Sequence, residues 1–325
     1  MQCYDVFNGD ADGICALVQL RLAEPRKAVL VTGVKRDINL LKRVNANAGD
    51  HITVLDISVR ANAKDLRRNL AAGASVFYVD HHNPGKLPDH ENLQAVIDTR
   101  PDICTALLVN HCLEGAYKEW AVVAAFGDNL LASAYALAKP IGYKPEHIEE
   151  LKRLGELLNY NAYGRDVTDL HFAPDKLFEI LVQYENPDAF LFSEPEIFQK
   201  LETGFFDDLR KAWNGEELLY TEFNLDNDIP SPIWLLDDAA WARRISGAFG
   251  NALANKTPDQ AHAVLTHNAH GGYMVSVRAP KNNPVGADVF CMQFPTGGGR
   301  ATAAGINHLP KDKLDRFITI FNKAF

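Results

Sequence analysis

The sequence lacks several features that would place the protein in a specialised class. Its five cysteines include no C-x-x-C pair, so neither a zinc ribbon nor a disulfide framework fits. No apolar run approaches the roughly 18 residues of a membrane span, and the first residues lack the pattern of a signal peptide. Low-complexity tracts are absent and 47% of the 325 residues are hydrophobic. We therefore expect a soluble, cytoplasmic protein of two globular domains with no membrane partner.

An excess of positive charge is also missing, because the formal net charge is −9. A protein that holds long duplex DNA by neutralising its phosphates needs a basic surface, so this class is disfavoured. Part of the negative charge fits a metal site, since carboxylates gathered around divalent cations count as negative until the ions are bound. The composition remains compatible with a basic groove on one part of the surface.

Short apolar runs alternate with helical patterns in the first part of the chain. Five strands are expected, at residues 4–7, 28–34, 52–55, 76–79 and 95–97. Three helices are expected between them, at residues 13–22, 37–44 and 61–72, the last with Gly73 as its C-cap. This βαβ order predicts an α/β fold with a doubly wound parallel sheet, whose ligands bind beyond the carboxyl ends of the strands.

The rest of the chain reads as mostly helical and then as α/β again. Helical patterns extend from about 107 to 183, including 120–137 and 147–159, and another covers 195–213. Beyond a linker at 224–232 we expect a helix at 237–253, strands at 262–266 and 273–277, a helix at 285–293, a Gly-rich turn and a terminal helix at 311–321. The predicted domains are residues 1–188 and a smaller α/β domain at 233–325, joined by a helical connector at 189–232.

Three oxygen-bearing side chains follow the first expected strand. Asn8, Asp10 and Asp12 alternate from the strand end onto the helix start, and hard cations such as Mg²⁺ and Mn²⁺ prefer such oxygen ligands. Gly13 lets the backbone turn tightly beside them. The alternative is that Asp10 and Asp12 only cap the helix, since acidic residues are common at that position.

Two further strand ends carry side chains of the ligand type. Asp56 follows the third expected strand, and Asp80-His81-His82 follows the fourth. A single Asp after a strand is usually a cap or a turn residue. However, the carboxyl ends of parallel strands share one edge, where ligands bind, so these side chains are expected to converge with Asp10. The convergence predicts a metal-dependent catalytic site.

The order of these motifs resembles the DHH phosphoesterase superfamily. After D-x-D-G, a lone Asp and D-H-H, the segment Gly127-Asp128-Asn129 supplies the later helical Asp of that family. Asn161-Ala162-Tyr163-Gly164-Arg165 resembles the N-A-x-G-R motif of its RecJ-type branch. In the last part, residues 297–305 resemble the G-G-G-H-x-x-A-A-G signature of the associated DHHA1 domain, and Ser276-Val277-Arg278 resembles its S-x-R strand.

The resemblance implies an active site in a cleft between a DHH domain and a DHHA1 domain. In relatives two Mn²⁺ or Mg²⁺ ions share the lone Asp, which is Asp56 here. The other implied ligands are Asp10 with Asn8 for one ion, and Asp12, His81 and Asp128 for the second. His82 would face the phosphate or leaving group, and Asp80 would orient the imidazoles.

Substrate contacts are implied as well, because guanidinium groups and glycine-rich backbone bind phosphate oxygens. The implied substrate-binding residues are Asn161, Arg165, Arg278, Gly297, Gly298, Gly299 and Arg300.

Two positions depart from the family pattern. Asn8 stands where relatives carry His or Asp, so one ion should be held more loosely. Arg300 stands where many carry His, which adds a permanent positive charge.

The expected function is hydrolysis of phosphate esters by metal-activated water, for which two cations about 3.5–4 Å apart are suited. The N-A-x-G-R motif favours a RecJ-like exonuclease or nano-RNase. The acidic composition favours small partners, such as a nucleotide, a short single-stranded oligonucleotide or 3′-phosphoadenosine 5′-phosphate. The alternative is a catalytically weakened member that binds nucleotides or nucleic acid, with Asn8 as the lesion. The sequence is also compatible with a homodimer.

Overall fold

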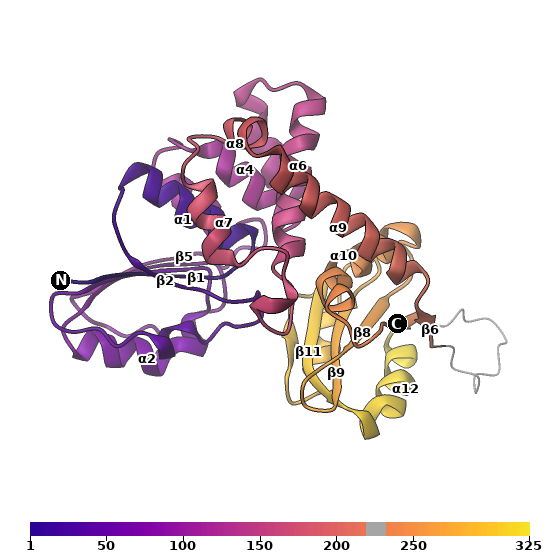
Figure 1. The fold of residues 1–325 in the computed structure, drawn as a ribbon. Helices are drawn as coiled ribbons and strands as arrows, with labels where there is room; N and C mark the ends of the chain where they lie inside the picture. Colours follow the sequence, from indigo (N-terminus) through magenta and orange to yellow (C-terminus); the bar gives the residue numbers. More distant parts are fainter. Residues whose placement is uncertain (219–231) are drawn as a thin grey trace. The chain divides into compact units, whose positions relative to one another are not determined.

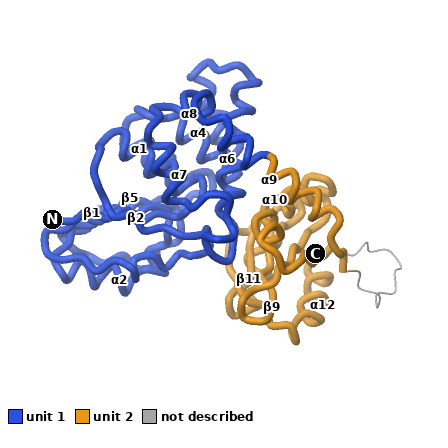
Figure 2. The backbone as a smooth tube through the Cα atoms, in the orientation of Figure 1, with its two compact units in different colours: residues 1–202 blue, residues 203–325 orange. Residues whose placement is uncertain are grey.

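The computed structural model describes residues 1–218 and 232–325, which form two compact units, residues 1–202 and 203–325 (Figure 2). The division falls within helix α9 (Pro195–Trp213), inside the segment predicted as a connector. The predicted linker at 224–232 lies outside the described residues, apart from Pro232. The domain boundaries drawn from the sequence at 188 and 232 stay a prediction.

Unit 1 contains a five-stranded sheet in the order β2-β1-β3-β4-β5, with every neighbouring pair parallel. Its strands are β1 (Cys3–Phe7), β2 (Val29–Val31), β3 (His51–Leu55), β4 (Ser75–Asp80) and β5 (Leu93–Ile97). Pairing of Phe7 with Leu55, and of Leu55 with Val79, brings the carboxyl ends of β1, β3 and β4 to one edge. The α/β fold with a parallel sheet is confirmed.

Helices cover both faces of this sheet (Figure 1). Helix α2 (Val59–Ala71) lies on one face, where Leu66 and Leu70 belong to the same buried core as Val54 and Tyr78 of the strands. Helices α1 (Ala11–Ala23) and α7 (Pro174–Leu181) lie on the other face. Burial on both faces explains why the strands read as continuous apolar runs rather than as alternating patterns.

The remaining helices of unit 1 follow the sheet in sequence. They are α3 (Thr105–Cys112), α4 (Lys118–Gly127), α5 (Leu131–Ala138), α6 (Pro145–Asn161) and α8 (Pro187–Ser193). Two expectations were wrong in detail. The helix expected at 37–44 is a single 3₁₀ turn, Leu40–Arg43. The helix expected at 120–137 is interrupted where Asn129 adopts a left-handed φ of 61°, so Asp128 caps the end of α4 instead of lying inside a helix.

Gly127 sets how closely α4 approaches its neighbours. A Cβ atom there would lie 2.4 Å from Ala11 Cβ of α1 and 2.8 Å from the Gly155 carbonyl of α6. Both distances are shorter than van der Waals contact, so the crossing requires a residue without a side chain. Close approach of α4 to α1 places Asp128 beside the residues that follow β1.

We expect Gly127→Ala to lower the free energy of unfolding by about 1–3 kcal/mol, since overpacking forces the helices apart. Gly250→Ala is the matched control, because Gly250 also lies within a helix but its Cβ would meet only ordinary contacts of 3.5 Å. That substitution should leave stability unchanged or raise it by up to about 1 kcal/mol through helix propensity. Denaturant unfolding of both variants measures the difference, and equal stability would contradict the role given to Gly127.

Unit 2 contains a mixed six-stranded sheet in the order β10-β11-β9-β8-β7-β6. Its strands are β6 (Glu216–Glu217), β7 (Ile233–Leu235), β8 (His262–His267), β9 (Gly272–Arg278), β10 (Gly297–Gly299) and β11 (Ala303–Pro310). Its helices are α10 (Ala240–Lys256), α11 (Ala287–Cys291) and α12 (Leu314–Ala324), the last preceded by a 3₁₀ turn, Lys311–Lys313. Phe290, Phe317 and Phe321 lie in its buried core.

The glycine-rich segment of unit 2 is a strand and not the predicted turn. Gly298 pairs with Gly305 of β11. A Cβ on Gly297 would lie 1.7 Å from the Cys291 carbonyl, and one on Gly299 would lie 2.4 Å from Ala304 Cα. The missing side chains therefore allow close backbone approach, which local strand propensity does not reveal. In neither described range does any helix have the length and apolarity that crossing a membrane requires.

Candidate metal centre

Acidic and imidazole side chains converge at the carboxyl edge of the unit 1 sheet. Within the described residues, two groups have ligand atoms close enough to share an ion: Asp56 with His81 and His82, and Asp12 with His81 and Asp128. His81 belongs to both groups. The parallel register explains this convergence, because strand ends that are far apart in sequence finish side by side.

His81 is oriented by the backbone so that one ring nitrogen faces the carboxylates. Its Nδ1 lies 3.0 Å from the Ile103 carbonyl, which can only accept a hydrogen bond, so Nδ1 carries the proton and Nε2 keeps its lone pair. The Nε2 atom lies 3.3 Å from Asp56 Oδ1, 3.8 Å from Asp12 Oδ2 and 4.0 Å from Asp128 Oδ2. A carbonyl that fixes the tautomer in this way is the usual support of a metal-ligating histidine.

Asp56 has an unusual backbone at the end of β3. Its φ is +58°, a left-handed conformation that costs most residues energy but that Asp and Asn tolerate better than others. The Thr105 hydroxyl donates to Asp56 Oδ1 at 3.2 Å, and the Asp56 amide donates to the Val79 carbonyl. Backbone strain of this kind is concentrated at functional sites.

Asp12 joins the centre to the amino end of α3. Its two carboxylate oxygens accept hydrogen bonds from the amides of Thr105 at 2.8 Å and Ala106 at 2.7 Å. The residue before this helix, Cys104, provides no side-chain cap, so Asp12 satisfies those amides from a distant part of the chain. Each oxygen retains a second lone pair that can face a cation.

Asp10 has both oxygens in use. Its Oδ1 accepts from the amides of Asp12 and Gly13, each at 3.1 Å, so the capping alternative raised from the sequence is correct for this oxygen. Its Oδ2 lies 2.5 Å from Lys35 Nζ, which also donates to Asn159 Oδ1 at 2.9 Å. Burial alone raises the pKa of the Asp10 carboxyl, but the Lys35 ammonium and the amide hydrogen bonds outweigh it and lower the pKa to about 2.

Asp80 and His82 form a pair at the rim of the centre. The Asp80 side chain is buried, and its Oδ1 lies 2.7 Å from His82 Nδ1. The His82 side chain is 45% exposed, so it can reach a molecule that His81, which is buried, cannot. A carboxylate bound to Nδ1 fixes the orientation of the ring, and the exposure of the side chain makes it accessible to a substrate.

The centre is electrostatically unfavourable without a cation. Burial raises the pKa of Asp56 well above its usual value, and the charges of Asp12, Asp10, Asp128 and Asp80 raise it further. Burial likewise raises the pKa of Asp12, and the charge that His81 carries only when it is protonated offsets this rise in part. Two buried oxygens, Asn8 Oδ1 and Asp80 Oδ2, have no hydrogen-bond partner within residues 1–218 and 232–325. Three carboxylates around an oriented imidazole nitrogen, with two acceptors left over, fit Mn²⁺ or Mg²⁺.

The raised pKa of Asp56 predicts that metal binding depends on pH. Because the folded carboxyl holds its proton above the unfolded pKa, the metal-free chain loses stability as pH rises through that interval. A cation needs the carboxylate, so Mn²⁺ binding should release protons and tighten as pH rises above the usual pKa of an aspartate. Titration calorimetry in two buffers of different ionisation enthalpy counts those protons. An affinity that stays constant over this range would refute the prediction.

The predicted substrate residues of unit 1 differ in their environments. Asn161 is buried: its amide donates to the Phe172 carbonyl at 2.8 Å, and its Oδ1 accepts from the amides of His171 and Phe172. It therefore shapes the chain around α6. Arg165 is exposed, and its amide is held by Asp169 at 2.7 Å. The substrate contacts assigned to both residues stay predictions.

Unit 2 holds the other predicted substrate residues. Arg278 donates to Asn251 Oδ1 at 2.7 Å, Ser276 Oγ at 2.9 Å and the Gly247 carbonyl at 3.1 Å, so the unit itself orients its guanidinium. Arg300 is exposed, and a Cβ on Gly298 would meet no atom within 4 Å. The edge strand β10 thus presents open backbone. The contacts assigned to Arg278, Arg300 and Gly297 to Gly299 stay predictions.

Sequence reasoning missed Lys35, Asn159 and Thr105. For Lys35 a signal was present, because it directly follows the strand expected at 28–34 and so belongs to the same sheet edge as Asp10. Thr105 and Asn159 had no comparable signal. Their positions depend on how α3 and α6 pack against the sheet, and a local sequence pattern does not predict that packing.

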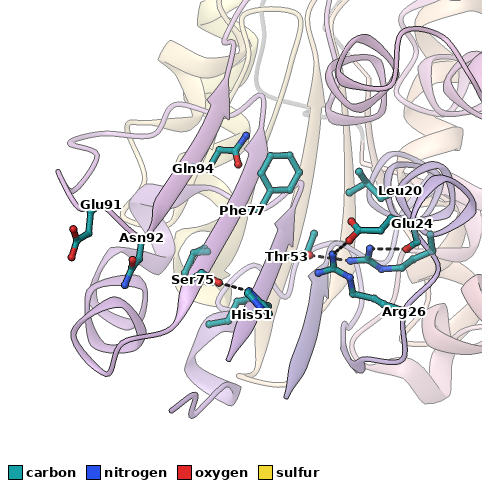
Figure 3. A pocket seen from close by; sticks show the side chains of 13 residues that line it. Leu20, Glu24, Arg26, His51, Thr53, Ser75, Phe77, Glu91, Asn92 and Gln94 are labelled. Atoms are coloured by element: carbon teal, nitrogen blue, oxygen red, sulfur yellow. Dashed lines mark hydrogen bonds and ion pairs between the residues drawn. The ribbon is translucent and has the colours of Figure 1, made fainter. Parts of the chain in front are cut away.

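A cavity of about 510 Å³ lies elsewhere in unit 1, at the amino ends of the strands (Figure 3). It is lined by His51, Thr53, Ser75 and Asn92, and by Arg21 at the end of α1. Arg21 is committed to a buried ion pair with Asp5 at 2.6 Å. None of the residues predicted for catalysis lines this cavity, so we assign the chemistry to the opposite edge of the sheet.

Comparisons with known proteins place this geometry among solved structures. No protein-family model matches the sequence, and no curated protein matches it significantly. A DHH-domain protein described as a member of the s1p family of ribosomal proteins is 14% identical, with a TM-score of 0.68 over 99% of this chain and 86% of its own. Exonuclease RecJ bound to manganese is 18% identical, with a TM-score of 0.58 over 99% of this chain and 89% of its own.

A third match is the pGpG-specific phosphodiesterase PggH from Vibrio cholerae, which is 14% identical with a TM-score of 0.52 over the whole of both chains. At these identities the likeness concerns the fold, and it extends across both units. The resemblance predicted from the motifs is therefore confirmed at this level: the chain has the fold of the DHH-domain proteins, RecJ among them.

Proposed function

We propose that this chain is a divalent-metal-dependent phosphoesterase that hydrolyses nucleotides or short single-stranded oligonucleotides. The observation that carries the proposal is the position of His81. Its Nε2 faces Asp56, Asp12 and Asp128 within 4.0 Å, while its Nδ1 is held by the Ile103 carbonyl. Such a set of donors is suited to a hard or borderline divalent cation and has no evident use in a purely structural core.

The residues divide into those that would hold the ion and those that would act on the substrate. Asp12, Asp56, His81 and Asp128 would hold it. A bound cation supplies Lewis acidity, neutralises phosphate charge and lowers the pKa of water. Asp80 keeps the His82 ring in place through Nδ1, so that Nε2 can donate a proton to the leaving oxygen or bind a phosphoryl oxygen.

Three considerations support a small substrate. The net charge of −9 disfavours a long polyanion. RecJ is named as an exonuclease, an enzyme that acts at a chain end, and PggH is named as specific for pGpG, a dinucleotide. The exposed Arg165 and Arg300 provide guanidinium groups suited to terminal phosphates.

A second candidate function is supported by a specific observation. The Lys35 ammonium already binds Asp10 Oδ2 at 2.5 Å, so this carboxylate is less available to an ion, and Asn8 is a neutral ligand. A protein that binds nucleotides or nucleic acid with weakened turnover would show these features. It would bind a phosphate-bearing ligand without hydrolysing it.

One assay separates the two candidates. Purified protein with Mn²⁺ is incubated with a short RNA ladder, single-stranded DNA, linear and cyclic dinucleotides, and 3′-phosphoadenosine 5′-phosphate. We expect release of mononucleotide or phosphate from at least one of these, and loss of release with a chelator. Measurable binding with no product from any substrate would reject the enzyme and favour the binding protein.

A further inference from the structure

Lys35 is built into the acidic cluster and is not a surface lysine that happens to reach it. Its Nζ lies 2.5 Å from Asp10 Oδ2, 2.9 Å from Asn159 Oδ1 and 3.8 Å from Asp128 Oδ1, and its side chain is 23% exposed. The ammonium also lies 5.6 Å from the centre of the Tyr163 ring. Four residues from three parts of the chain thus surround one positive charge.

The backbone of Lys35 is fixed by residues of the same site. Its amide donates to the Ala162 carbonyl at 2.8 Å, and its carbonyl accepts from Asn8 Nδ2 at 3.2 Å. A Cβ on Gly9 would lie 2.0 Å from the Gly33 carbonyl, so glycine at position 9 lets the segment after β2 come this close. The ammonium is therefore positioned before any ligand arrives.

Asn8 gains a physical explanation from this arrangement. A histidine with its ring in that place could coordinate an ion, and an aspartate would have no donor for the Lys35 carbonyl. The asparagine supplies that donor. Its other polar atom, Oδ1, is a single neutral oxygen, whereas Mn²⁺ and Mg²⁺ take about six donors with several of them charged.

The two parts of the cluster differ in what remains for a cation. Asp10 accepts hydrogen bonds on both oxygens, one at the cap of α1 and one from Lys35, and the Lys35 ammonium repels a cation from this carboxylate. In the described part of the chain, neither group of acidic and imidazole ligand atoms close enough to share an ion includes Asp10. The ligands that remain together are Asp12, Asp56, His81 and Asp128.

We propose that Lys35 replaces one of the two divalent cations that the family resemblance implies, so that the centre holds a single ion beside a fixed ammonium. The inference deepens the proposed phosphoesterase function and rests on it. An ammonium carries one charge and three N–H donors, so it can hold a phosphate oxygen. It cannot act as a Lewis acid on water, so activation of the nucleophile falls to the one ion and its ligands.

The test counts bound ions instead of relying on turnover. Protein freed of metal is titrated with Mn²⁺, and bound metal is measured by calorimetry and elemental analysis. Electron paramagnetic resonance then distinguishes an isolated Mn²⁺ from an exchange-coupled pair. We expect one ion per chain in the wild type, with the spectrum of an isolated ion. In Lys35→Met we expect two ions per chain and a coupled spectrum, because Asp10 Oδ2 is released.

Three further variants complete the test. Lys176→Met removes a lysine that is 62% exposed and pairs with Glu179, and it should keep one ion. Lys35→Arg retains the positive charge and should also keep one. If Lys35→Met does not fold, Lys35→Gln gives a second route, because it removes the positive charge beside Asp10 while keeping a polar side chain, and it should also raise the count to two.

The outcomes separate this inference from the proposed function. Two ions in the wild type would overturn the inference and leave the phosphoesterase standing. One ion in both the wild type and a folded Lys35→Met would also overturn it, because the lysine would then not be what excludes the second ion. No ion in the wild type at millimolar Mn²⁺ would overturn the inference together with the metal-dependent function.

Discussion

Asp56→Asn is expected to reduce Mn²⁺-dependent turnover by roughly three orders of magnitude or more, which corresponds to about 4 kcal/mol of lost transition-state stabilisation. Asp56 lies 3.3 Å from His81 Nε2 and accepts from the Thr105 hydroxyl. Asparagine keeps an oxygen for that hydroxyl and tolerates the left-handed φ of +58°. The loss should therefore come from the missing charge and not from a distorted backbone.

The free energy of unfolding of the metal-free Asp56→Asn variant should not fall along with its turnover. Because burial and neighbouring carboxylates raise the pKa of Asp56, a neutral amide should make the metal-free protein at least as stable as the wild type. The stabilisation that Mn²⁺ gives to the wild type in a thermal melt should shrink or disappear. Lower stability together with retained turnover would show that Asp56 is structural.

Asp98→Asn is the matched control for this experiment. Asp98 also follows a strand, β5, but its side chain pairs with Arg100 at 2.7 Å, and both side chains are partly exposed. An exposed ion pair contributes little to stability, because solvent and salt screen it. Turnover and Mn²⁺ affinity should stay within about twofold of the wild type.

His82→Gln should lower kcat by about 10²- to 10⁴-fold, the range that a positioned proton donor contributes. Mn²⁺ affinity should change by less than about threefold, since His81 and three carboxylates are retained. The ring of His82 is 45% exposed and bound to Asp80 through Nδ1, so its other nitrogen is the group able to meet the leaving oxygen. His111→Gln, which changes an exposed histidine on α3, should leave kcat unaffected.

The leaving group tells us whether His82 donates a proton. A p-nitrophenyl ester of a nucleotide has a leaving group that needs no protonation, so His82→Gln should lose far less activity on it than on a sugar-leaving substrate. An equal loss on both substrates would assign His82 to phosphate binding. Loss of Mn²⁺ affinity by a factor of ten or more would instead make it an ion ligand.

Much of this centre could be predicted because its residues obey one topological rule. Strand runs ending before Asp10, Asp56 and Asp80 were readable as apolar segments, and parallel pairing brings their ends to one edge. The rule needs no knowledge of side-chain packing. For the same reason it could have placed Lys35, which follows β2.

Other features depended on tertiary contacts that no local pattern records. The segment of β11 begins Ala303-Ala304-Gly305, residues of low strand propensity, and it forms a strand because β9 and β10 lie on either side of it. Asn161 belonged to a motif associated with substrate, yet its amide and carbonyl groups are bound to His171 and Phe172. A motif identifies a residue that matters without saying which group it contacts.

The hydrogen bonds that complete the centre join segments that are synthesised far apart in time. Thr105 and Asp12 are 93 residues apart in sequence, and Lys35 and Asn159 are 124 apart. A chain emerging from the ribosome therefore carries Asp10 and Asp12 long before α3, α4 and α6 exist to complete the set. We expect the nascent protein to hold no ion tightly until most of unit 1 has been translated, so that metal loading follows folding and cannot guide its first steps.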